Sequence, residues 1–310
     1  MVQDATASSP SRLIARLRAW LGRESWTPGI LATPSHTPHA GSFPAGGAAR
    51  QPAISYTVTI VKVGQCEMPG PLVYRTSSED EWHTLYFYFV VVRGGGKTLV
   101  INTGLPEDLS ELNALWGEMA GPRCQVTRQS DERLGPVLVR LGLNPRTVDY
   151  VIATPFKGYL LANLSEFPNA TVCVSQRGWT ERYLARRYPS PMPDPTAVSD
   201  AMLDRLQTGA PNPLRLLRDD EELLPGIRVR WVGIHDRSTV AVVVHTGSGD
   251  VVITDACLMY EHIEGMVPLG VTESLEACLN AFVMVRQSGP LIVPLYDPLV
   301  LERFEGGRIV

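Results

Sequence analysis

A helix end, a turn and a short apolar strand follow one another in LGLNPRTVDYVIAT, residues 141–154. Glu132–Leu141 has the apolar spacing of a helix, and Gly142 is a typical residue to end it. Val148–Ala153 is a short apolar run of the kind found in strands. The strand leads into the loop TPFKGYLLAN, residues 154–163. This stretch predicts an α/β protein, and the loop after the strand is a candidate position for functional residues.

The same alternation extends in both directions along the chain. Each half opens with strands, and Gly94–Gly96 predicts a turn between two of them. This order predicts two sheets packed face to face with helices outside, a four-layered αβ/βα sandwich. The other predicted strands are Tyr56–Val63, Leu85–Arg93, Thr98–Asn102, Thr171–Ser175, Arg228–Val232, Thr239–His245, Val251–Thr254 and Leu291–Pro294, and the other predicted helices are Ser110–Met119, Asn163–Phe167, Gly178–Arg187, Ser199–Thr208 and Leu275–Gln287.

Bulk composition excludes several classes of protein. The chain has 310 residues and a net charge of −4, so nothing favours nucleic-acid binding, which needs a clustered basic surface. No run reaches the roughly 20 apolar residues of a membrane span, and arginines interrupt the N-terminus where a secretory signal would be apolar. The five cysteines show no paired spacing, so we expect free thiols and a cytoplasmic protein.

Residues 1–53 are predicted to be an extension, with the folded domain spanning residues 54–310. Thr27–Pro52 is rich in Pro, Gly, Ala and Ser, which is typical of an irregular linker. Before it, Ser11–Leu21 places apolar residues on one helical face and arginines on the rest. This basic amphipathic helix could be a transient helix in a tail, dock onto a partner protein or lie on an anionic membrane surface.

Seven segments stand in a recognisable order along the chain: Val100–Leu105 (VINTGL), Leu141–Thr154, Asn163–Thr171 (NLSEFPNAT), Gly233–Ser238 (GIHDRS), Val251–Ala256 (VVITDA), Tyr260–Gly265 (YEHIEG) and Val293–Pro298 (VPLYDP). Together they resemble the metallo-β-lactamase-fold superfamily, in particular its acyl-homoserine-lactonase-like branch. The resemblance covers roughly residues 54–304 and implies the metallo-β-lactamase fold.

The metal motif of that family is replaced in this chain. Active members carry His-x-His-x-Asp-His after the strand, and these residues bind two metal ions that activate water. The matching positions hold Pro155, Lys157, Tyr159 and Leu160, and Tyr296 stands at the final histidine. The resemblance leaves His235 and Asp255 as the only matches to metal ligands. Since catalytic zinc takes about three protein ligands, we predict no metal and no other cofactor.

Three interpretations of the replaced site remain open. In the first, Lys157 pairs with Asp255, substitutes for the metal charge and only maintains the fold. In the second, the pocket is re-purposed for metal-independent chemistry of a hydrolase, lyase or cyclase type. His235, oriented by Asp255, is then a general base, Tyr159 and Tyr296 donate to an oxyanion, and Lys157 stabilises charge.

In the third interpretation, the chain is a pseudoenzyme or non-catalytic subunit that binds a ligand or partner. The partner could be a second copy or an intact paralogue in a hetero-oligomer. A metallo-hydrolase with an atypical metal site is the remaining alternative. Cys257 is a candidate nucleophile only if a base activates it. Pro189–Pro195 and Leu203–Leu217 are expected to shape the mouth of the pocket.

Overall fold

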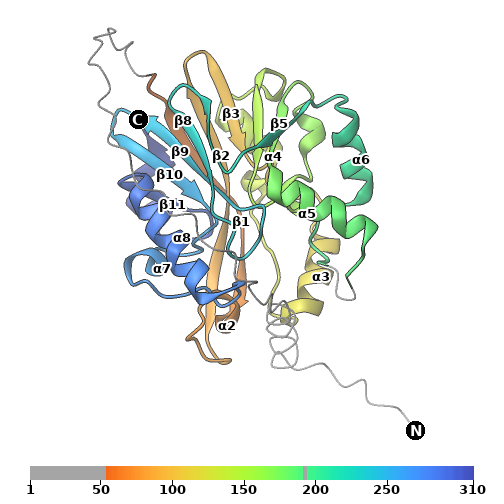
Figure 1. The fold of residues 1–310 in the computed structure, drawn as a ribbon, viewed down its shortest axis with the longest axis vertical. Helices are drawn as coiled ribbons and strands as arrows, with labels where there is room; N and C mark the ends of the chain where they lie inside the picture. The colour runs from red at the N-terminus through yellow and green to blue at the C-terminus, as the bar shows by residue number, and fades with distance from the viewer. Residues whose placement is uncertain (1–53, 191–193) are drawn as a thin grey trace, which may run out of the picture.

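Two β-sheets lie face to face in the centre of the protein, and helices cover both outer sides (Figure 1). The computed structural model describes residues 54–190 and 194–310. The predicted N-terminal amphipathic helix and residues 191–193 of the Pro-rich loop lie outside the described residues. The prediction of a four-layered αβ/βα sandwich is confirmed.

The first sheet has seven strands, of which the four on one side, β3 to β6, are parallel. Antiparallel β1, β2 and β3 are followed by β4, β5 and β6, which all run parallel to β3. In spatial order the strands are β12 (Arg308–Ile309), β1 (Thr57–Pro69), β2 (Trp82–Gly94), β3 (Lys97–Ile101), β4 (Tyr150–Ala153), β5 (Thr171–Ser175) and β6 (Leu214–Leu217).

The second sheet has five strands, and all of its neighbouring pairs are antiparallel except β10 with β11. The spatial order is β11 (Leu291–Pro294), β10 (Gly249–Thr254), β9 (Val240–Thr246), β8 (Ile227–Trp231) and β7 (Asp220–Leu224).

The α-helices of the described residues are short, and serine caps several of them. Ser199 accepts a hydrogen bond from the amide of Met202, and Ser274 accepts one from the amide of Ala277. These contacts satisfy amides that the first helical turn leaves unpaired. The helices are α2 (Gly70–Val73), α3 (Ser110–Ala120), α4 (Leu134–Arg140), α5 (Gln176–Arg187), α6 (Asp200–Thr208), α7 (Tyr260–Glu264), α8 (Leu275–Ser288) and α9 (Val300–Arg303).

Strand β2 shows why the chain forms layers. Its residues 87–92 are all buried, because the strand lies in the middle of a sheet that is covered on both faces. The glycine turn before β3 is confirmed, with Gly95 and Gly96 at φ values of 57° and 71°. A hairpin turn needs this left-handed conformation, which glycine adopts without strain.

Three strands were missed in the sequence: β6, β7 and the two-residue strand β12. Leu214–Leu217 was expected to shape the pocket mouth, but it forms the edge strand β6 and pairs with β5. The charged segment Asp220–Leu224 is also an edge strand, paired with β8 only. Edge strands tolerate polar residues on the open side, so their apolar pattern is weak. Within residues 54–190 and 194–310, no helix is both long and apolar enough to cross a membrane.

Candidate functional site

The loop after β4 is held in place by the loop after β3. The side-chain amide of Asn102 donates to the carbonyl oxygen of Thr154 at 2.8 Å, and its oxygen accepts from the Thr154 amide at 3.0 Å. The Thr103 hydroxyl donates to the carbonyl oxygen of Leu160 at 2.9 Å. Asn102 has a φ of 59°, a left-handed conformation that asparagine adopts more readily than most residues. These bonds fix both ends of the segment that carries Lys157.

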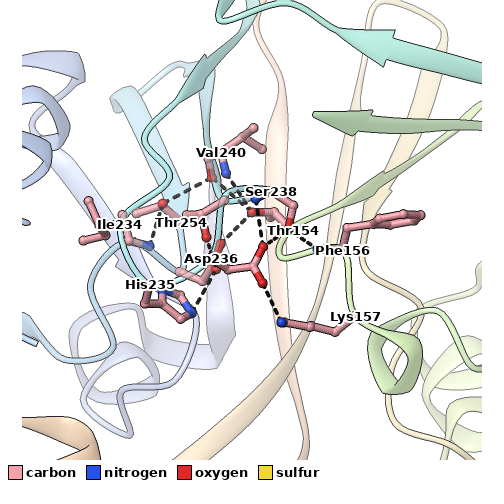
Figure 2. Close-up of polar contacts among 12 residues, drawn as sticks. Thr154, Phe156, Lys157, Ile234, His235, Asp236, Ser238, Val240 and Thr254 are labelled. Atoms are coloured by element: carbon pink, nitrogen blue, oxygen red, sulfur yellow. Dashed lines mark hydrogen bonds and ion pairs between the residues drawn. The ribbon is translucent and has the colours of Figure 1, made fainter. Parts of the chain in front are cut away.

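Lys157 lies between two carboxylates. Its ammonium forms an ion pair with Asp236 at 2.5 Å and a second, shorter one with Asp194. Only 15% of the Lys157 side chain and 17% of the Asp236 side chain are exposed. Figure 2 shows Lys157 extending toward Asp236, which lies on the loop between β8 and β9. The expected pair of Lys157 with Asp255 is therefore wrong.

The charges of this triad, Lys157, Asp194 and Asp236, stabilise one another. Burial opposes the charged form of Lys157, but the nearby carboxylates of Asp236 and Asp194 raise the pKa of the ammonium above its usual value. Burial likewise opposes the charged form of Asp236, but Lys157 and the hydrogen bond from Ser238 hold its pKa below the usual value. Both groups are therefore charged at neutral pH.

The triad also joins the loop after β4 to the segment before α6. The amide of Gly158 donates to the carbonyl oxygen of Thr196 at 2.9 Å, and Lys157 forms an isolated antiparallel bridge with Ala197. A β-carbon at Gly158 would lie 3.3 Å from the Ala197 carbonyl oxygen. Asp194–Ala197 thus lies directly against the residues at the second metal-histidine position.

Asp255 is completely buried, and threonine hydroxyls satisfy it. Thr154 donates to Oδ1 at 2.5 Å and Thr239 donates to Oδ2 at 2.8 Å. Burial raises the pKa of the carboxyl above its usual value, and the charge of His235 and the two hydroxyls oppose that shift. Hydrogen bonding of a buried carboxyl offsets much of its desolvation, so Asp255 does not need Lys157.

His235 approaches Asp255 but does not form the orienting hydrogen bond expected of a base. Its Nε2 lies 3.6 Å from Oδ2 of Asp255, which is longer than a hydrogen bond. Its Nδ1 is buried and has no hydrogen-bond partner among the described residues. The structure therefore places the two residues next to each other, but the imidazole is not held in one orientation by the carboxylate.

Tyr159 and Tyr296 fill the site with aromatic rings. Their hydroxyls are hydrogen-bonded to each other, and burial raises the pKa of Tyr159 to about 12 and that of Tyr296 well above its usual value. The ring of Phe87 packs edge-on against both, with centroid distances of 6.3 Å and 5.7 Å. Trp116 packs edge-on against Tyr159 at 5.6 Å. These phenols line a packed core.

Cys257 does not have the surroundings of a nucleophile. The side chain is completely buried, and burial raises the pKa of its thiol, so the thiol stays protonated. An activated thiol needs a nearby cation or base to lower its pKa. All five cysteines are free and buried.

Two residues of the site, Asp194 and Asp236, were missed in the sequence. Asp236 could have been found, because it follows His235 on the same loop. Asp194 has no comparable pattern, because it lies 37 positions from Lys157 in a Pro-rich segment. The contact between Asp194 and Lys157 depends on how two loops that are distant in the sequence pack against each other.

Comparison with known proteins establishes the fold. No family model matches the sequence, and no curated protein matches it. Solved structures do match. An N-acyl homoserine lactone hydrolase, with N-hexanoyl-L-homoserine bound at its catalytic metal centre, superposes with a TM-score of 0.65 at 16% identity, over 81% of this chain and 96% of that one.

Two further structures agree with the first. A variant of B. thuringiensis AiiA with N-decanoyl-L-homoserine bound has a TM-score of 0.66 at 16% identity, over 81% of this chain and 96% of that one. A probable metal-dependent hydrolase from Staphylococcus aureus has a TM-score of 0.59 at 17% identity, over 79% and 90%. The chain therefore has the metallo-β-lactamase fold. Its structural neighbours include N-acyl homoserine lactonases, which confirms the predicted resemblance at the level of the fold.

The residues that the resemblance assigns to the metal positions do not fit a pair of metal ions. Lys157 presents a cation, and both oxygens of Asp255 already accept hydrogen bonds from hydroxyls. Tyr159 and Tyr296 are neutral phenols bonded to each other. Across the part of the chain that the structure describes, no group of three or more His, Cys, Asp or Glu side chains is arranged to hold a metal ion.

Proposed function

We propose that this chain is a metal-depleted, non-catalytic homologue of the lactonase-like hydrolases, which acts by binding a ligand or a partner. One observation carries the proposal: the polar groups at most of the lactonase metal positions are satisfied by other residues of the protein. Lys157 is neutralised by two carboxylates, Asp255 by two hydroxyls, and Tyr159 by Tyr296. A metal-dependent hydrolytic centre instead needs open metal positions for water and substrate.

Metal analysis tests this proposal directly. The full chain is expressed in medium supplemented with zinc or iron, desalted and measured by mass spectrometry, beside an intact lactonase prepared in the same way. We expect far less than one metal ion per chain and no chelator-sensitive lactone hydrolysis. Near two metal ions per chain, with activity lost on chelation, would overturn the proposal.

The partner is proposed to be a second copy of the chain or an intact paralogue, and the N-terminal extension is the proposed docking segment. Light scattering of the full chain alone, and of the chain mixed with the paralogue, distinguishes the two partners. A monomer in both samples would leave ligand binding as the mode of action, which is measured separately below.

The second candidate is a metal-independent enzyme, and His235 favours it. The imidazole is partly exposed, with 21% of its side chain accessible, and its Nδ1 has no partner among the described residues. His235→Ala is therefore compared with the wild type for turnover and for thermal stability. Loss of turnover with unchanged stability would support the enzyme, whereas the non-catalytic proposal expects no turnover in either protein.

A further inference from the structure

A cavity lies beside the segment that follows Tyr296. It has a volume of about 320 Å³ and is lined by residues just after α2, near the start of β2, at the start of α7 and after β11. These elements meet at the end of the sandwich where α2 and α7 lie in Figure 1. This volume is at the lower end of the range for small-molecule sites. None of the residues at the lactonase metal positions lines it.

The lining of this cavity carries negative charge and contains neither lysine nor arginine. Glu261 is exposed at the cavity, while Asp297 is buried beside it. Both oxygens of Asp297 accept backbone amides, from Tyr260 at 2.6 Å and Leu299 at 2.8 Å. An anionic ligand would therefore meet repulsion here, and a cation would be attracted.

The hydroxyl groups of the cavity already make hydrogen bonds within the protein. Tyr74 is hydrogen-bonded to Glu261, and Thr84 donates to Oε1 of Glu67 at 2.6 Å. Nε2 of His83 is buried and has no hydrogen-bond partner in the described part of the chain, and it is an acceptor when the proton is on Nδ1. In that tautomer, Nε2 and the Glu261 carboxylate both accept hydrogen bonds, and a ligand with N–H or O–H donors would satisfy them.

The cavity also has an aromatic wall. The ring of Tyr74 packs edge-on against His83 at a centroid distance of 4.8 Å and tilts against His262 at 4.6 Å. His262 is completely buried, and Nδ1 bonds to the Val267 carbonyl oxygen at 2.8 Å. Burial lowers the pKa of His262 to about 4, so its imidazole is neutral at pH 7. Neutral aromatic rings attract cations through their faces.

We propose that this cavity binds a compact organic cation, a primary ammonium with a short apolar chain. The ammonium would donate to Glu261 and His83 beside the Tyr74 ring. The apolar chain would pack on Met259, Pro298 and Leu299, which also line the cavity. This inference rests on the ligand-binding form of the proposed function and names a class of ligand, and its test is separate, because metal content and turnover at the other site do not bear on it.

Binding is measured on the full chain labelled with [methyl-¹³C]methionine, which gives signals from eight methionines. Met259→Leu assigns the signal from the cavity. The probes are n-butylammonium and its neutral analogue n-butanol, titrated at pH 7. We expect a saturable shift of the Met259 signal with the amine and about tenfold weaker binding of the alcohol, a difference of about 1.4 kcal/mol.

Two variants test the electrostatic argument. Glu261→Gln should weaken amine binding about fivefold to tenfold, whereas Glu276→Gln, an exposed control on α8, should not change it. Leu299→Arg places a cation beside the cavity at a residue that is 40% exposed, and it should abolish amine binding while the other methionine signals stay in place. The proposal is wrong if the amine gives no saturable shift, if the alcohol binds equally well, or if neither variant weakens the amine.

Discussion

Replacing Lys157 by methionine tests the triad most directly. The substitution keeps the length of the side chain and removes the ammonium, which leaves Asp236 and Asp194 next to each other without a cation. Removing one partner of a buried ion pair costs about 3–5 kcal/mol, because the remaining charge is desolvated and unpaired. Asp194 is 31% exposed, and water screens part of its charge, so the lower end of that range applies.

We therefore expect Lys157→Met to lower the free energy of unfolding by about 3 kcal/mol and the melting temperature by roughly 6 °C. Urea denaturation at pH 7, followed by circular dichroism, measures this loss. The matched control is Lys97→Met. Lys97 forms an ion pair with a single carboxylate, Asp149, at 2.7 Å, and 44% of the lysine side chain is exposed. Lys97→Met should therefore lower the free energy of unfolding by less than about 1 kcal/mol.

The loss should also depend on pH in a defined direction. The pKa of Asp236 is lowered in the folded protein, so its stabilising contribution is present above the unfolded value of about 3.9 and is lost as pH falls through the folded pKa. The pKa of Lys157 is raised, so its contribution is present below about 10.4 and is lost as pH rises through the folded pKa. The pair thus stabilises the fold between about pH 4 and pH 10.

Without Lys157, burial raises the pKa of Asp236, and protonation then removes the unpaired charge. The difference in stability between wild type and Lys157→Met should therefore be largest near pH 7 and should shrink toward pH 4. Equal losses for Lys157→Met and Lys97→Met, or a difference that does not change with pH, would refute the assignment of Lys157 as a buried counter-charge.

Three further predictions concern the neighbouring residues. Thr239→Val removes a donor to Asp255 and should lower the free energy of unfolding by about 1–3 kcal/mol in urea denaturation; no loss would mean that the hydroxyl does not stabilise the carboxyl. The pKa of Asp255 is raised in the fold, so the wild type should lose stability as pH rises from about 3.9 through the folded pKa. Asp255→Asn should lack that loss, and a pH-independent difference between the two proteins would contradict it. Tyr296→Phe keeps the ring and should cost about 1 kcal/mol, whereas Tyr296→Ala should cost about 3–5 kcal/mol; equal costs would show that the ring is not packed.

The fold was predictable because its strands and helices differ clearly in apolar spacing. The strands β4, β5 and β11 are rich in apolar residues, and their positions were predicted to within two residues. The edge strands β6, β7 and β12 were missed, because charged residues interrupt or replace the apolar pattern of β6 and β7 and β12 has only two residues. The start of helix α4 was predicted two residues too early, because a 3₁₀ turn at Ser130–Glu132 precedes the helix.

The sequence predicted some neighbours in the candidate site but not the partners of Lys157. The resemblance named Lys157, Tyr159, His235, Asp255 and Tyr296 as candidate pocket residues, and the structure brings Tyr159 next to Tyr296 and His235 next to Asp255. The predicted partner of Lys157 was wrong. The sequence shows that Lys157 lies on the loop after β4, but it does not show which other loops pack against that loop.

Lys157, Asp255 and the tyrosine pair, which the resemblance assigns to metal positions, are each compensated by neighbouring residues, and this has a consequence for introducing a metal site. A single ammonium cannot neutralise three carboxyl groups, so Lys157 pairs with Asp194 and Asp236 while threonine hydroxyls satisfy Asp255. Changing Lys157 to histidine would supply one metal ligand, but it would leave Asp194 and Asp236 without their counter-charge. The tyrosine pair would still occupy two other ligand positions with packed rings. Restoring one ligand at a time should therefore destabilise the protein before it creates a metal site.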